Sequence, residues 1–435
     1  MFLARLLVLF SLVCISCAHS SFEQKQLKHA LDFATSNRLE LEILLQHYTY
    51  DSLKLEAAKF LIRNMPHCYS YQQGGEMDSV KRVRTYYSPF GQIDQTYARR
   101  WGHYTYRNLP KIYDAHIITA EYLIDNIDRA FDNWQKRPWN RSLSFEDFCE
   151  YLLPYRIGDE PLEEWRELYE KKYGYLLDSI YKGGDVVEAA NLVSRHLQEP
   201  VFIYCEDFEL PHIGPRYLFS HRYGSCVDAA DIVTYAFRAV GIPCMEDTDA
   251  RGGHVWNVVR DTTGRDVPIW YIASEAVRGS RDTGGYKRGK VYRPMYGFQE
   301  EKAAHLGDDW KSMPLLFYHP YMKDVSYAYY PDTLRILTGI PDDEVCYLAH
   351  FHEAHWWSCA CARSASGKME IPNLESELVY LPMKYTKGNY YPSGFPFWFA
   401  GGEINTFLPD WEKTVKVRLY RKYPVYGWLR SFMGH

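Results

Sequence analysis

The sequence predicts an α+β fold built from three successive parts. Apolar residues recur at helical spacing over residues 22–180, helices and strands alternate over 181–300, and short β-like runs fill 305–435. The chain has 435 residues, of which 46% are apolar and 24% charged, so it is long and apolar enough to bury sizeable cores. We therefore expect a globular protein of two or three domains.

The charge balance argues against one class of partner. The formal net charge is −5 at neutral pH. A nucleic-acid-binding protein needs a basic face, and this charge balance gives no electrostatic case for one. We expect no nucleic acid partner.

The first residues, MFLARLLVLFSLVCISCAHSS, are typical of an export signal. Their apolar run is too short to cross a bilayer and is followed by small and polar residues, so residues 1–17 are interpreted as a signal peptide. The ending resembles a bacterial lipobox with Cys17 as the lipid-bearing residue, although Cys14 stands where Leu is usual. Cleavage near Ala18 without a lipid is the alternative. The prediction is export to the periplasm or outer membrane, with the membrane bound through Cys17.

The remaining cysteines do not form a recognisable disulfide pattern. Export would permit disulfides, but these residues are far apart and lack the spacing of small disulfide-rich scaffolds. We expect most of them to be buried, apart from the one discussed below. They are Cys68, Cys149, Cys205, Cys226, Cys244, Cys346, Cys359 and Cys361.

Residues 22–180 carry several helical stripes. Leu53, Ala57 and Leu61 lie on one face of a helix that Pro66 should end. Similar stripes run from Leu27 to Ala34 and from Leu123 to Trp134. Packing explains all of them.

Local signals mark where further helices begin and end in this part. Ser144 and Asp147 have the spacing of a capping box, and Pro154 should close the helix that follows. Pro161 is placed where the first turn of the next helix, LEEWRELYEKKYG, would begin.

The central part, 181–300, mixes element types. The segment DVVEAANLVSRHL predicts a helix. The runs HVWNVVR and VPIWYIA flank the turn-like DTTGR, which predicts a β-hairpin.

Strand signals dominate the third part. The runs VCYLAHF, ELVYLPM and FPFWFA are short and β-rich, and residues 415–420 alternate between apolar and polar. Short strands separated by Gly and Pro predict a sandwich-like β domain over 305–435.

One cysteine has the setting of a nucleophile. Cys226 follows YGS and opens a helical run that ends at Gly241 and Pro243. In the first turn of a helix, the positive end of the dipole favours a thiolate, and the unpaired N–H groups there could hold an oxyanion. Asp228 in the same turn opposes the thiolate. His254, which follows two glycines and opens a strand, is the candidate base.

These residues together resemble the transglutaminase-like core, a relative of the papain-like cysteine enzymes. The resemblance rests on GSC, on RAVGIP at the end of the same helix, and on GGHVWNVV. It implies that Cys226 is the nucleophile and His254 the base, that the substrate is a peptide, protein or glycoprotein, and that no metal or cofactor is needed. The flanking parts resemble exported Gram-negative proteins that carry this core.

The third member of the family's triad is missing from its usual position. Trp270 stands where an aspartate would orient the histidine. If the hairpin turn centres near Thr263, His254 lies opposite residues 272–273, and Glu275 is the nearest carboxylate beyond them. Glu275 is therefore the candidate orienting residue, and a site without an acid is the alternative.

A second cluster invites a metal interpretation. His350, His352, His355, Cys359 and Cys361 fall within HFHEAHWWSCAC, but their spacing matches no standard zinc pattern. Two strands joined by a turn at HEAH explain the segment better, so we expect no metal.

Two functions remain open. The first is an exported cysteine peptidase or amidase acting through Cys226 and His254. The second is a binding or scaffold protein that kept this fold and lost catalysis, which Trp270 at the acid position and the two large flanking parts would explain.

Overall fold

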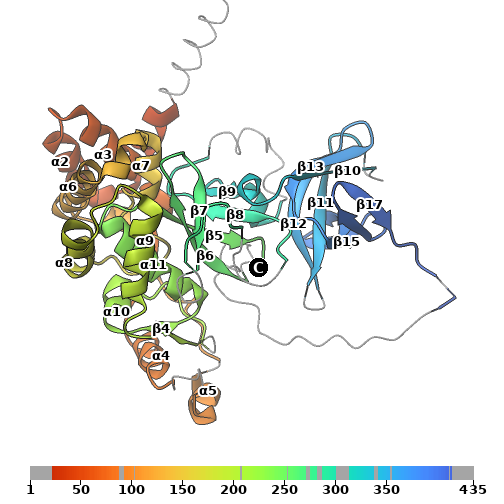
Figure 1. The fold of residues 1–435 in the computed structure, drawn as a ribbon, viewed down its shortest axis with the longest axis horizontal. Helices are drawn as coiled ribbons and strands as arrows, with labels where there is room; N and C mark the ends of the chain where they lie inside the picture. Colours follow the sequence, from red (N-terminus) through yellow and green to blue (C-terminus); the bar gives the residue numbers. More distant parts are fainter. Residues whose placement is uncertain are drawn as a thin grey trace, which may run out of the picture.

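The structure is a computed structural model that describes most of the chain. The described residues are 22–87, 93–101, 103–205, 208–251, 253–270, 275–281, 287–299, 313–337, 341–352, 355–410 and 412–413. The predicted signal peptide with Cys17 and the predicted strand at 415–420 lie outside them. Within them the chain is α+β: helices come first and strands follow (Figure 1).

The first part is helical, as predicted. Residues 22–33 are helical, and a short antiparallel pair of strands, β1 (Tyr69–Tyr71) and β2 (Lys111–Tyr113), interrupts the helices. The helices are α2 (Arg38–His47), α3 (Ser52–Asn64), α4 (Glu76–Arg84), α5 (Gln95–Trp101), α6 (Ala120–Lys136), α7 (Phe145–Tyr151), α8 (Arg166–Tyr175) and α9 (Val186–Leu197).

Side-chain caps fix where several of these helices begin. The side chain of Asp51 accepts a hydrogen bond from the first turn of α3, and Asp185 does the same for α9. Ser144 accepts from the backbone N–H of Asp147, so the predicted cap of α7 is confirmed. Helix α3 ends at Asn64 and Pro66 lies in the 3₁₀ turn that follows, as predicted.

The predicted start of α8 at Pro161 is wrong. The helix begins at Arg166, and the residues before it make tertiary contacts instead of helical ones. The carboxylate of Glu163 accepts the backbone N–H of Arg216 at 3.0 Å, and the carbonyl of Glu163 accepts from the hydroxyl of Tyr122 at 3.1 Å. These contacts tie the segment to other parts of the protein outside a helix, so the tertiary structure overrides the local helix signal.

The central part contains a helix packed on an antiparallel sheet. The sheet has the order β7-β6-β5-β8-β9. Its strands are β5 (Cys244–Asp249), β6 (Val255–Arg260), β7 (Asp266–Ile269), β8 (Val291–Pro294) and β9 (Met322–Asp324). Helices α10 (Pro215–Ser220) and α11 (Cys226–Ala239) precede it, with the short parallel pair β3 (Ile203–Tyr204) and β4 (Tyr223–Gly224).

The hairpin of β6 and β7 has the predicted register. Asn257 lies opposite Ile269 and Arg260 opposite Asp266, which centres the turn on Thr263. The sheet has two distinct faces. The amide of Asn257 donates to the carbonyl of Ala230 in α11 at 3.0 Å, so this face covers the helix.

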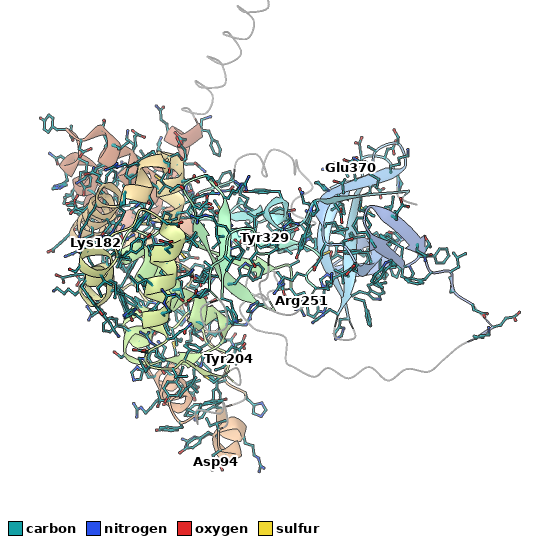
Figure 2. The ribbon with its side chains drawn as sticks, in the orientation of Figure 1. Asp94, Lys182, Tyr204, Arg251, Tyr329 and Glu370 are labelled. Atoms are coloured by element: carbon teal, nitrogen blue, oxygen red, sulfur yellow. The ribbon has the colours of Figure 1, made fainter. Side chains whose placement is uncertain are left out.

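The other face of the sheet points toward the C-terminal strands. The indole N–H of Trp256 donates to the hydroxyl of Tyr329 at 2.9 Å. In Figure 2, Tyr329 and Arg251 lie between the β5–β9 sheet and the strands drawn in blue, while the helices cover the opposite side. Successive residues of β6 therefore point to opposite faces of the sheet, one face toward α11 and the other toward Tyr329.

The C-terminal part is built of antiparallel strands. One sheet has the order β12-β11-β14-β16-β17, with β15 also paired to β14, and β10 pairs with β13. The predicted strands VCYLAHF, ELVYLPM and FPFWFA correspond to β11, β14 and β16. The elements are α13 (Leu315–Tyr318), β10 (Asp332–Leu337), β11 (Val345–His352), β12 (His355–Arg363), β13 (Lys368–Leu374), β14 (Leu378–Thr386), β15 (Asn389–Pro392), β16 (Phe397–Ala400) and β17 (Glu403–Thr406).

One hydrophobic core joins the helical and central parts. Tyr71 and Leu177 from the helical part belong to the same buried cluster as Ile232 of α11 and Val259 of β6. The predicted boundary at residue 181 therefore does not separate two cores. The C-terminal strands have a second core that contains Tyr380 and also takes in Tyr292 of β8 and Met322 of β9.

Two further findings concern the chain as a whole. None of the eight cysteines within the described residues is in a disulfide, and seven of them are buried, including Cys205 and Cys244. Among the described helices, none combines the length and apolar character that crossing a membrane requires.

Candidate functional site

Cys226 is the first residue of α11, as predicted. Ser225 precedes it as the N-cap, and the helix behind it is buried along its whole length. Only 7% of the surface of Cys226 is exposed. Its neighbours in a small apolar cluster are Val227, Ala230 and Val255. The sulfur is therefore at the positive end of a helix dipole and shielded from water.

A capping box closes the start of α11. The hydroxyl of Ser225 accepts the backbone N–H of Val227 at 3.3 Å, and the carboxylate of Asp228 accepts the N–H of Ser225 at 2.7 Å. These N–H groups are thus already used. The expectation that they are unpaired and could hold an oxyanion is wrong for Ser225 and Val227.

Asp228 has a buried partner that the sequence did not reveal. A guanidinium nitrogen of Arg84, in α4, lies 2.9 Å from its carboxylate, and both side chains are almost fully buried. Gly224 makes this arrangement possible, because a Cβ there would lie 2.3 Å from the same carboxylate. The positive charge of Arg84 offsets the effect that Asp228 was expected to have on the thiol.

His254 lies directly before β6 and is also buried, with 6% exposed. Its imidazole packs against two tryptophans: the ring centroids are 5.7 Å from Trp256 and 4.4 Å from Trp270. The residue beside it, Val255, belongs to the cluster of Cys226. Val255, at the start of β6, thus belongs to the cysteine's cluster, and His254, just before the strand, contacts the two tryptophans.

Trp270 is the shared neighbour of both predicted catalytic residues. Its indole packs against the Cys226 cluster and lies nearly perpendicular to the imidazole of His254, at 77°. It occupies the position where the family's aspartate was expected. The apolar cluster of Cys226 and the imidazole of His254 therefore share Trp270 as a neighbour.

Glu275 is placed elsewhere. One carboxylate oxygen lies 2.5 Å from Arg195 of α9, and both side chains are about half exposed. The next residue, Ala276, is tied to the side chain of Asn191 by two backbone hydrogen bonds, at 2.8 and 2.9 Å. These contacts attach the segment to α9 and do not support the predicted orienting role.

The histidine-rich segment forms the predicted hairpin. His352 lies opposite His355 where β11 meets β12. His350 is fully buried, and burial is the main reason that its pKa falls to about 3. The described residues contain no group of three His, Cys, Asp or Glu side chains able to hold a metal ion.

A second polar constellation lies on the sheet-facing side of α11. Nδ1 of His212 is 2.9 Å from a carboxylate oxygen of Asp231, which is fully buried in α11. Burial alone would lower the pKa of His212, but Asp231, Asp159 and Glu160 raise it well above its ordinary value. At neutral pH the pair is therefore an imidazolium held by an aspartate.

Glu246, on β5, belongs to the same constellation. Its carboxyl group lies 2.7 Å from the hydroxyl of Thr234 in α11. Burial, with a further contribution from Asp231, raises the pKa of Glu246 to about 8. No local pattern in the sequence points to this group, because His212, Asp231 and Glu246 lie in three separate segments of the chain.

Comparison with known proteins adds no assignment. No family model, no curated protein and no solved structure matches the chain.

Proposed function

We propose that the protein is an exported cysteine-dependent acyl-transfer enzyme with a transglutaminase-like core, and that it hydrolyses peptide or amide bonds. The observation that carries the proposal is the placement of Cys226 at the first residue of a buried helix, beside the strand that His254 precedes. A helix packed on an antiparallel sheet, with the sulfur at its N-terminus, is the arrangement that nucleophilic cysteines use.

The proposed chemistry follows from these two side chains. The Cys226 thiolate adds to the carbonyl carbon of the amide, the C–N bond breaks, and His254 gives the proton to the leaving amine. Water then adds to the thioester, the C–S bond breaks, and the acid is released with Cys226 restored. No metal or cofactor takes part in this route.

The larger architecture is part of the same proposal. Buried residues of β10 and β13, such as Leu334 and Met369, share one core with Leu348 of β11 and Tyr380 of β14. Two sets of antiparallel strands around one core support a sandwich-like C-terminal domain. The composition of residues 1–17 supports export, with lipid on Cys17 as the anchor.

A binding or scaffold function is the second candidate, and one observation favours it. Trp270 packs on both the Cys226 cluster and His254, and both residues are more than nine-tenths buried. An indole at this junction fills the space that a substrate carbonyl would need. In that case Cys226 is a buried core residue, and the protein keeps the fold of an enzyme without its catalysis.

Thiol reactivity separates the two candidates. The enzyme requires Cys226 to react with iodoacetamide at pH 6–7 about tenfold or more faster than a free thiol, which corresponds to a thiol pKa lowered by about one unit. Peptide mass spectrometry would identify the modified residue, with Cys226→Ser as the blank.

The matched histidine controls are His254→Ala and His355→Ala, since His355 is exposed at the start of β12. The enzyme predicts that only His254→Ala slows the reaction at Cys226. A rate equal to that of a free thiol, unchanged in His254→Ala, would favour the scaffold.

A further inference from the structure

A cavity of about 400 Å³ lies between the helical part and the central sheet. Its wall includes His212, Asp159 and Glu246. Ligand pockets for small molecules have volumes from roughly 300 to 1,000 Å³. The cavity is therefore large enough for a small molecule, and the polar constellation beside α11 opens into it.

Three wall residues present polar groups to this space. Nδ1 of His212 is held by Asp231 at 2.9–3.0 Å, and among the described residues these are the ring's hydrogen bonds, which leaves Nε2 for a ligand. One carboxylate oxygen of Asp159 accepts the backbone N–H of His212 at 2.9 Å. Glu246 is bonded to Thr234 through one oxygen. The ring nitrogen Nε2 of His212 and one carboxyl oxygen each of Asp159 and Glu246 are thus left to bind a ligand.

These groups include both donors and acceptors. The imidazolium of His212 donates through Nε2, the carboxylate of Asp159 accepts, and the protonated carboxyl of Glu246 can do either. The strongest charges of the wall are matched inside the protein: His212 is paired with Asp231, and Arg156 with Asp114. The cavity therefore presents hydrogen-bonding groups to a ligand, and little unpaired charge.

Aromatic rings form the rest of the wall. The imidazole of His67 and the phenol of Tyr321 stack at 3.6 Å, and Tyr69 and Tyr113 line the cavity near Lys111. The ammonium of Lys111 already lies 3.9 Å above the ring of Tyr69, so that ring face holds a cation of the chain itself. The remaining ring surfaces suit an uncharged ligand with apolar faces.

We propose that this cavity is a binding site for a small hydroxyl-rich ligand of the monosaccharide class, and that His212, Asp159 and Glu246 bind its hydroxyl groups. A hydroxyl group both donates and accepts, as these three residues require. The C–H faces of a sugar ring pack on aromatic side chains. The proposal concerns a cavity separate from the chemistry of Cys226, although Val227 and Val255 line the cavity and also belong to the Cys226 cluster.

The test is ligand-observed NMR on the full chain with D-glucose, D-galactose and N-acetyl-D-glucosamine, followed by titration calorimetry of any sugar that binds. We expect saturation transfer to at least one sugar with the wild type and an unchanged Kd with Cys226→Ser. Asp159→Asn, which keeps the shape and the bond to the His212 N–H, should weaken binding about tenfold, as the loss of a hydrogen bond to a charged group does.

A second variant moves the imidazole of His212 without removing it. A Cβ at Gly158 would lie 2.4 Å from the imidazole of His212, so Gly158→Ala should displace the ring and abolish binding. Thermal unfolding of each variant confirms that it is folded.

Absence of binding to all three sugars would overturn the inference, as would binding that survives both Asp159→Asn and Gly158→Ala. Binding of L-lysine or L-glutamate in place of the sugars would also overturn the assignment of ligand class. Because Cys226→Ser is predicted to bind normally, failure here and failure of the proposed cysteine chemistry can be told apart.

Discussion

The indole of Trp270 lies 4.4 Å from the imidazole of His254, measured between ring centroids, and stands nearly perpendicular to it. The same indole packs against the apolar cluster that contains Cys226. One side chain therefore contacts both the imidazole and the apolar cluster around the sulfur.

Trp270→Ala should expose Cys226. Removing the indole opens space over a thiol that is now 7% exposed, so we expect its alkylation by iodoacetamide to become several-fold faster. The partly buried indole also contributes to packing, and we expect a loss of about 2 kcal/mol in the free energy of unfolding. Trp398→Ala, at an exposed tryptophan of β16, is the control and should leave the rate unchanged. An unchanged rate in Trp270→Ala would mean that other groups shield the sulfur.

Arg84→Ala should destabilise the protein strongly. The substitution leaves the Asp228 carboxylate buried without its cationic partner, which typically costs about 3–5 kcal/mol in the free energy of unfolding. Urea unfolding measures this loss. The double variant Arg84→Ala with Asp228→Asn should recover part of it, since no unpaired charge remains. Equal stability of the single and double variants would contradict this account.

The free energy of unfolding should fall as Glu246 ionises. The pKa of Glu246 is raised from 4.5 to about 8 in the folded protein, mainly by burial, so the folded state binds this proton more tightly than the unfolded state does. The corresponding stability is complete below about pH 4.5 and is lost as the pH rises through 8.

Glu246→Gln removes this contribution while keeping the shape of the side chain. The difference in unfolding free energy between wild type and variant should therefore change across pH 4.5–8 and be constant outside that window. Subtracting the unfolding free energy of the variant from that of the wild type separates the ionisation of Glu246 from that of its neighbours Asp231, His212 and Arg238. A difference that does not depend on pH would show that Glu246 is not protonated in the folded state.

Asp231→Asn should lower the pKa of His212. Burial acts to lower that pKa, and the carboxylate of Asp231 is the largest influence that opposes it. Titration of the His212 ring protons by NMR measures the change. A His212 titration that stays at its wild-type value would assign the raised pKa to Asp159 and Glu160.

Elements with strong local patterns could be predicted from the sequence. Helix α11 carries a continuous apolar face with a cap before it and Gly241 after it, and the hairpin of β6 and β7 has a short turn that fixes its register. In these elements local propensity and tertiary packing agree. At Pro161 they disagree, because the contacts of Glu163 keep the residues before α8 out of the helix.

The polar contacts of the site could not be predicted, because they join residues distant in the sequence. Arg84 reaches Asp228 across 144 residues. Asp159 and His212, in the cavity wall, are separated by 53 residues. Neither the 3.6-residue nor the two-residue period carries information on such pairs. Glu275 shows the same limit: it was chosen from hairpin geometry, but Arg195 of α9 is its partner.

The core that Tyr71 and Leu177 share with Ile232 and Val259 has a consequence for how the molecule melts. Side chains from both sides of residue 181 exclude water from one another, so neither segment retains an intact interior when the other is removed. Heating should therefore disrupt this shared cluster and the β5–β9 sheet in a single transition, and a chain cut near residue 181 should expose apolar surface on both pieces.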